Sequence, residues 1–75
     1  MNKFKNYEGI ICKDRTELLL LAKIAKEKGY KVNPKIINRP RYSHIIFFEG
    51  YFCDAADWAI KDKISKEEFI KRLNH

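Results

Sequence analysis

Apolar residues recur with a helical period in the first half of the chain and predict one long helix. Asp14 and Glu17 have the spacing of a capping box at its start, and Gly29 is typical of a helix C-terminus. The positions between them that are spaced three or four apart, and that are expected to face the core, are Leu18, Leu21, Ala22 and Ala25. The pattern therefore predicts a helix that begins after Asp14 and ends before Gly29.

Three further apolar residues lie in the same helix. Leu20 and Ile24 are expected to widen the apolar face. Leu19 is expected to point away from it, on the polar side of the helix, together with Arg15, Lys23 and Lys26. An exposed leucine is normal in a folded protein, and it is also compatible with a contact surface that is both basic and apolar.

Runs of β-branched and aromatic residues predict strands on both sides of this helix. The first strand is expected over residues 7–12, and the second over 30–32, directly after the helix. Strand, helix and strand in this order are typical of a βαβ unit, so the first two strands are expected to pair in parallel. Ile36 and Ile37 either extend the second strand or lie in a loop with one side chain buried.

A β-hairpin is predicted in the second half of the chain. Residues 38–41 are expected to form a loop, because a proline at position 40 disfavours helical conformation at the preceding residue. A strand over 42–48 follows, Glu49-Gly50 fits a two-residue turn, and 51–53 is expected to return as the last strand.

Two short helices are predicted after the hairpin. Asp54 is expected to cap a helix from Ala55 to about Lys61, with Trp58 facing the core. Ser65 and Glu68 have the spacing of a capping box for a third helix. The apolar face expected for this third helix consists of Phe69, Ile70 and Leu73, with Ile64 packing onto Phe69.

These elements predict one small α+β domain over residues 1–75. The expected sheet is mixed, has three or four strands in βαββ order, carries the long helix on one face and has the short C-terminal helices at an edge. The longest apolar run, residues 18–22, is far shorter than the roughly 20 residues that cross a bilayer. A cytoplasmic protein without a membrane partner is expected, and the edge strands would permit a homodimer.

Of the properties of the composition, charge is the one that indicates most about a binding partner. The 75 residues include 16 Lys and Arg and 10 Asp and Glu, a formal net charge of +6. Residues 1–42 contain eleven Lys and Arg against four acids, whereas residues 43–75 contain five against six. The first half is therefore strongly basic, which indicates an acidic partner.

The positive charge is concentrated between residues 23 and 42, where two tyrosines are interleaved. The candidate partner-binding residues are Lys23, Lys26, Lys31, Lys35, Arg39, Arg41 and Tyr42. If they share one side of the domain, they form a continuous basic face. The expected partner is a larger protein or a ribonucleoprotein complex. Nucleic acid, an anionic nucleotide gripped by Arg39 and Arg41, and a solvated face without a partner are the alternatives.

The sequence contains no recognisable catalytic motif or closely spaced set of metal ligands. Cys12 and Cys53 lie 41 positions apart and are expected to be reduced core residues, with a disulfide as the alternative if their strands adjoin. His44 has no neighbouring ligand at a metal-binding spacing, and Asp54 and Asp57 fit helix starts. The expectation is a binding protein that is not an enzyme and uses no metal or cofactor.

Three segments resemble small α/β proteins encoded in bacteriophage genomes: the strand-to-helix start from Ile10 to Glu17, the helix exit from Lys28 to Tyr30, and the ending from Ile64 to Ile70. Proteins of that kind often act as stoichiometric inhibitors of host proteins, including antiviral defences such as CRISPR effectors, and they typically have no active site. The resemblance implies docking on a larger host protein or defence complex. Many such inhibitors are acidic mimics of nucleic acid, and this basic chain departs from that type.

Overall fold

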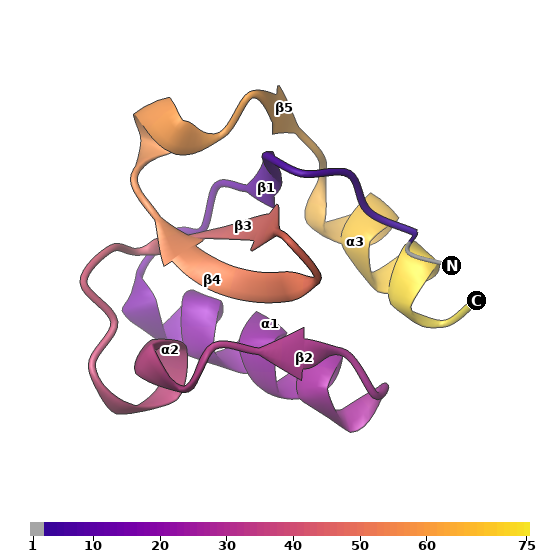
Figure 1. The fold of residues 1–75 in the computed structure, drawn as a ribbon, viewed down its shortest axis with the longest axis horizontal. Coiled ribbons are helices and arrows are strands. Elements are labelled where there is room, and N and C mark those ends of the chain that lie inside the picture. Colours follow the sequence, from indigo (N-terminus) through magenta and orange to yellow (C-terminus); the bar gives the residue numbers. More distant parts are fainter. Residues whose placement is uncertain (1–2) are drawn as a thin grey trace.

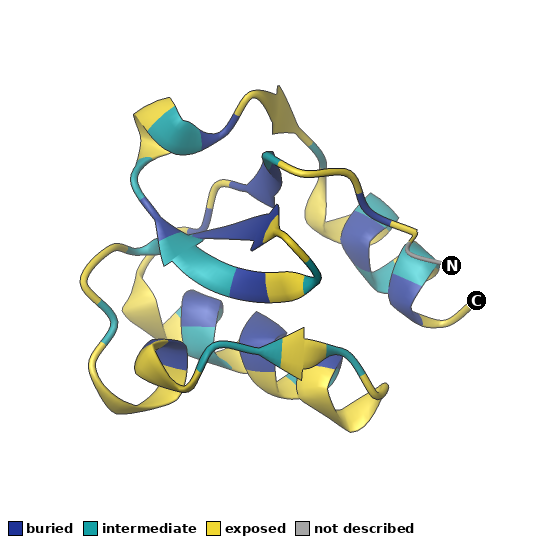
Figure 2. Cartoon of the chain, in the orientation of Figure 1, coloured by how far each residue is buried: buried dark blue, intermediate teal, exposed yellow. Residues whose placement is uncertain are grey.

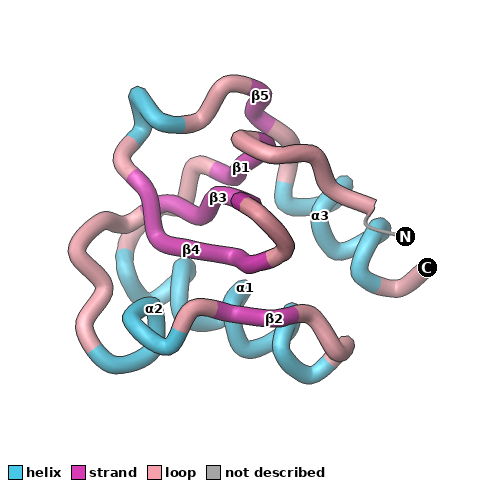
Figure 3. The backbone as a smooth tube through the Cα atoms, viewed as in Figure 1, coloured by secondary structure: helices cyan, strands magenta, loops and turns pink. Residues whose placement is uncertain are grey.

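The computed structural model describes residues 3–75 as a five-stranded mixed sheet with helices packed mainly on one side (Figures 1 and 3). The elements are β1 (Glu8–Ile10), α1 (Arg15–Glu27), β2 (Lys31–Val32), α2 (Pro34–Asn38), β3 (His44–Phe48), β4 (Tyr51–Ala55), the 3₁₀ helix η1 (Asp57–Ala59), β5 (Asp62–Lys63) and α3 (Lys66–Leu73). The α+β class is as predicted, but the sheet has five strands and extends beyond a βαββ order. No helix of residues 3–75 is long and apolar enough to cross a membrane.

The strand order is β2-β4-β3-β1-β5. β3 is antiparallel to both β1 and β4, whereas β2 pairs in parallel with β4 and β5 pairs in parallel with β1. The predicted pairing of the first two strands is wrong, because the β3–β4 hairpin lies between them. β3 and β4 pair over five residues each, and β2 offers only two, so the hairpin occupies the centre of the sheet and β2 its edge.

The main core lies between α1 and the sheet. The predicted core face of α1 is confirmed, since Leu18, Leu21, Ala22 and Ala25 are its buried residues. Figure 2 shows the same division, with buried positions of α1 toward the sheet and exposed positions on its outer side. The other fully or nearly buried members of this core are Phe4, Ile10, Cys12, Ile36, Ile45, Phe47, Phe52, Phe69 and Leu73.

Two leucines of α1 lie opposite to their predicted positions. Leu20 is 58% exposed, whereas Leu19 is half-buried and packs against the core. At about 100° per residue, Leu20 is about 160° from Leu18 around the helix and Leu19 only about 100°. The half-buried position is therefore the one nearer the core face, and Leu20 is the exposed leucine of this helix.

The predicted helix ends are confirmed. The Asp14 side chain accepts from the backbone N–H of Glu17 at 2.9 Å, and the Glu17 carboxylate accepts from the N–H of Lys13 at 2.7 Å. Ser65 caps α3 in the same way, accepting from the N–H of Glu68 at 3.0 Å. Gly29 follows α1 with φ +91°, a conformation that favours glycine.

Ile36 and Ile37 lie in a short helix, α2, instead of a strand or a loop. The Asn33 side chain accepts from the N–H of Lys35 at 2.9 Å, and Pro34 occupies the first helical position, where its fixed φ suits a helix. As one predicted alternative required, only one of the two isoleucines is buried, and it is Ile36. Of the predicted loop over 38–41, Asn38 is instead the last residue of α2, and residues 39–41 are the loop, which Figure 3 shows as part of the connection to β3.

The predicted helix from Ala55 to Lys61 is wrong, and so is the inward Trp58. Asp54 belongs to β4, only the three residues of η1 are helical, and Trp58 is 84% exposed. The Asp54 carboxylate is already occupied by two N–H groups of the loop before β3, so it does not cap a helix.

Residues 56–60 instead cross the sheet face opposite α1, which we call the open face. Ile60 packs there with Ile46 and Ala55 in a second, smaller core. Gly9 makes this possible, because a Cβ at that position would lie 2.8 Å from Cγ1 of Ile60. The crossing segment covers only part of the open face, so several side chains there stay accessible to a partner.

Candidate functional site

All seven candidate residues of the predicted basic face are exposed, and they lie on several elements. Lys23 and Lys26 belong to α1, Lys31 to β2 and Lys35 to α2. The remaining three, Arg39, Arg41 and Tyr42, belong to the segment between α2 and β3.

The structure brings three of these cations together at α2 and the following loop. Lys35, Arg39 and Arg41 line one shallow hollow of about 500 Å³ together with Pro34 and Asn38. Its lining combines a proline ring with long side chains that have aliphatic stems and charged ends. This arrangement suits a partner that presents anionic groups around an apolar centre.

Arg15 was not among the predicted partner-binding residues, although it was expected on the same side of the helix as Lys23 and Lys26. Its guanidinium donates to the backbone carbonyl of Arg41 at 3.4 Å, which links the start of α1 to the loop. The available signal was its position on α1, because Arg15, Lys23 and Lys26 point to the same side of the helix. We call Arg15, Lys23, Lys26, Lys35, Arg39, Arg41 and Tyr42 the basic surface.

The loop that carries Arg41 and Tyr42 is held by Asp54. One oxygen of the Asp54 carboxylate accepts from the backbone N–H of Arg41 at 2.7 Å and from that of Tyr42 at 2.9 Å. Charge-assisted bonds of this kind are stronger than neutral ones. The loop is therefore preorganised, which lowers the conformational entropy lost when a partner binds.

The cations of the basic surface are not neutralised within the described part of the chain. The ion pairs of residues 3–75 are Lys63–Asp57, Lys66–Glu17, Arg72–Glu8 and Arg72–Glu68, and none includes a basic-surface residue. The Lys66–Glu17 bond of 2.6 Å lowers the pKa of the Glu17 carboxyl and raises that of Lys66. Cations of the C-terminal half thus pair with Glu8, Glu17, Asp57 and Glu68, and within residues 3–75 no acid forms an ion pair with a side chain of the basic surface.

Lys31 lies apart from the other candidates. It is paired in register with Tyr51, and its ammonium lies 5.6 Å from the centroid of that ring. Its neighbour Val32 is on the opposite side of the strand and packs against the main core, so Lys31 faces the open face. We therefore exclude it from the basic surface.

Aromatic side chains gather on the open face, which sequence reasoning also missed. Phe48 and Tyr51, paired at the end of the β3–β4 hairpin, are 37% and 43% exposed. The Tyr7 and Phe48 rings lie 5.3 Å apart, and the ammonium of Lys61 lies 4.7 Å from the Tyr7 centroid. The signal was the period of two along β3, because residues 44, 46 and 48 face away from α1.

Neither cysteine is in a setting that favours thiol chemistry. Cys12 is buried, as predicted, and burial, followed by the charge of Glu17, raises the pKa of its thiol to about 11. Cys53 is only half-buried, and burial raises its pKa too. His44 Nδ1 accepts from the backbone N–H of Cys12 at 3.0 Å, a structural role. Within residues 3–75 no three His, Cys, Asp or Glu side chains are grouped as metal ligands.

Comparison of the chain with protein-family models, curated proteins and solved structures gives no match. The resemblance to bacteriophage-encoded inhibitors therefore stays a prediction. The inference of function rests on the two accessible features described above, namely the uncompensated basic surface and the aromatic open face.

Proposed function

We propose that this chain is a non-enzymatic binding protein that docks through its basic surface on an acidic surface of a larger protein or ribonucleoprotein complex, and thereby inhibits or modulates it. The observation that carries the proposal is the hollow of Lys35, Arg39 and Arg41, whose side chains form no ion pair within residues 3–75. Uncompensated charge of one sign steers an oppositely charged partner and sets its orientation.

The composition of the surface supports a protein as the partner. The hollow combines Pro34 with arginine stems, and the neighbouring Ile37 is exposed. Arginine is enriched in protein interfaces, and apolar contact between charged groups is typical of them. The Asp54 anchor holds the loop in place before binding, which favours specific docking over diffuse attraction.

The test compares two charge-reversal variants of equal net charge. Lys35→Glu with Arg41→Glu alters the basic surface, whereas Lys3→Glu with Lys71→Glu alters exposed lysines outside it. The chain is immobilised, proteins are captured from a host-cell lysate with and without nuclease, and the affinity of each captured protein for purified variants is measured.

We expect the first variant to lose at least about tenfold in affinity, because each removed charge contact contributes about 1 kcal/mol or more. The control variant should bind nearly as well as wild type. If wild type and the Lys35–Arg41 variant bind a captured protein with equal affinity, the basic surface is not the contact. Capture that disappears after nuclease treatment would assign the binding to nucleic acid instead.

Nucleic acid is the second candidate, and Tyr42 favours it. This exposed ring directly follows Arg41, so a base can stack next to a phosphate contact. A gel-shift titration at low and moderate salt tests the idea. Binding through phosphates falls steeply as salt rises, and absence of binding at low salt would eliminate this candidate.

A further inference from the structure

Three shallow hollows connect the basic surface to the open face. The hollow of Lys35, Arg39 and Arg41 shares Pro34 with a second hollow of about 270 Å³. The second shares Phe48 and Cys53 with a third of about 260 Å³. The lining is continuous, and we call this path the track; its aromatic residues are Tyr7, Tyr42, Phe48, Tyr51 and Trp58.

The rings along the track are accessible and partly held in place. Phe48 and Tyr51 are paired across the hairpin, so the backbone fixes their spacing. Tyr7 packs against Phe48, while Trp58 extends from η1 and is the most exposed of the large apolar residues. Several ring faces are thus available for stacking by a planar ligand group.

Cations lie beside these rings. Lys31 lies over Tyr51 and Lys61 over Tyr7, at 5.6 Å and 4.7 Å from the ring centroids. None of the ion pairs of residues 3–75 includes either lysine. The acids that line the track are Glu49 and Asp54, and the Asp54 carboxylate is occupied by two backbone N–H groups. With Lys35, Arg39 and Arg41, the cations outnumber the acids.

We propose that the track binds single-stranded nucleic acid. Bases stack on the exposed rings, and phosphates are contacted by Lys31 and Lys61 on the open face and by the arginines at the other end. A single strand fits because its bases are free to leave their own stack and lie on side-chain rings, whereas a duplex hides the faces of its bases. This proposal goes beyond docking on a protein, since it requires the open face.

A second copy of this chain is the other occupant that the apolar lining would suit, but charge opposes it. Each copy has a formal net charge of +6. A two-fold interface presents the same patch from both sides, so Lys31 and Lys61 of one copy would face a patch with the same cations. The cations attract an anionic polymer, whereas they repel a second copy of the positively charged chain.

The probes for the test are fluorescein-labelled oligothymidylate and oligouridylate of about 12 nucleotides, within the usual site size of single-strand binders. A DNA duplex of the same length and a polyglutamate peptide serve as competitors. Trp58 is the only tryptophan of the chain, so its fluorescence reports stacking in the third hollow, which Trp58 lines together with Tyr42. Anisotropy and tryptophan emission are recorded at low and moderate salt.

We expect a single strand to bind, to quench Trp58 and to be displaced poorly by the duplex and by polyglutamate. Trp58→Ala should lower the affinity about 5- to 150-fold, the range of one lost stacking contact, and Trp58→Phe should restore most of it. Leu20→Ala, at an exposed apolar residue of α1 outside the track, is the matched control and should bind as wild type does.

Absence of binding at low salt, or a duplex bound as tightly as the single strand, would overturn the proposal. Polyglutamate that competes as well as the oligonucleotide would also overturn it, and would fit docking on an acidic protein. If Lys35→Glu with Arg41→Glu abolishes binding while Trp58→Ala leaves it unchanged, bases do not stack on the track. The basic surface alone then accounts for the binding. These outcomes therefore distinguish a failure of single-strand binding on the track from a failure of docking through the basic surface.

Discussion

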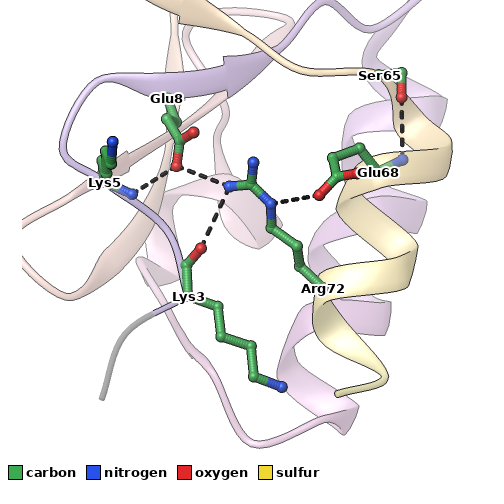
Figure 4. Close-up of polar contacts among 6 residues, drawn as sticks. All are labelled: Lys3, Lys5, Glu8, Ser65, Glu68 and Arg72. Carbon is green, nitrogen blue, oxygen red and sulfur yellow. Dashed lines mark hydrogen bonds and ion pairs between the residues drawn. The ribbon is translucent and has the colours of Figure 1, made fainter.

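Glu8 is the charged residue that is buried within residues 3–75, and Arg72 neutralises it (Figure 4). The Arg72 guanidinium donates to the Glu8 carboxylate at 2.9 Å, to Glu68 at 2.7 Å and to the carbonyl of Lys3 at 3.3 Å. The bond to Arg72 lowers the pKa of the Glu68 carboxyl. Glu8 also accepts from the backbone N–H of Lys5 at 2.6 Å. One side chain of α3 thus joins that helix to β1 and to the segment before it.

Replacing Arg72 by methionine is expected to destabilise the fold by about 3 kcal/mol, the lower end of the range for breaking a buried ion pair, because Arg72 is partly exposed. The variant leaves the Glu8 carboxylate buried without its cation, which costs more than the pair itself contributes. Urea unfolding followed by circular dichroism measures the loss. The double variant Glu8→Gln with Arg72→Met should recover part of it, and a double variant no more stable than Arg72→Met would contradict this account.

Cys12 is expected to make stability depend on pH at the alkaline end. Its thiol has a pKa of about 11 in the fold against an ordinary value of 9.0, mainly because burial disfavours the thiolate. Because the pKa is raised in the fold, the full stabilising contribution of this thiol is present below pH 9. As pH rises from 9 toward 11, the free energy of unfolding falls by about 2–3 kcal/mol, because the thiol ionises more readily in the unfolded chain. The stability difference between wild type and Cys12→Ala should therefore shrink over that interval. A constant difference would contradict the shift.

The turn between β3 and β4 can be improved at one position. Glu49 and Gly50 have φ of 47° and 88°, so both central residues adopt positive φ, as in the two-residue turns that prefer Asn-Gly. Glutamate is strained there, and asparagine tolerates the conformation better. Glu49→Asn should raise the free energy of unfolding by about 0.5–1 kcal/mol. Glu49→Ala is the control, and an equal gain from it would point to charge removal instead.

Helix caps, helix ends and tight turns were predictable from the sequence. The caps at Asp14 and Ser65, the exit at Gly29 and the turn at Glu49-Gly50 depend on neighbours within a few positions, and the structure shows all four. The strand order was not predictable in this way, because it depends on contacts between distant segments. Asp54 shows the difference well: its position fits a helix cap, but its partners lie 12 and 13 residues earlier.

The candidate site was predictable only as a set of exposed cations. The hollow of Lys35, Arg39 and Arg41 joins residues close in sequence, which a run of basic residues indicates directly. The role of Arg15 and the separation of Lys31 follow from tertiary structure, since one depends on a helix–loop contact and the other on a strand face. The aromatic track depends on strand pairing and was missed for the same reason.

For the whole molecule, the uneven charge distribution predicts a response to salt. The basic-surface cations repel one another, and their repulsion is screened as ionic strength rises. Added sodium chloride should therefore raise the melting temperature measured by scanning calorimetry. Lys35→Glu with Arg41→Glu should reduce this rise more than Lys3→Glu with Lys71→Glu, which has the same net charge. A melting temperature that falls with salt would mean that the ion pairs dominate.

The position of β1 has a consequence for how the chain is made. β1 lies between β3 and β5, and its buried carboxylate is neutralised from the last turn of α3. A ribosome synthesises β1 before β3, β5 and α3, so the Glu8 carboxylate has no cation partner until Arg72 of α3 has been added. Nascent chains that stop before α3 should therefore remain open to proteases, and protection should arrive in one step once that helix has emerged.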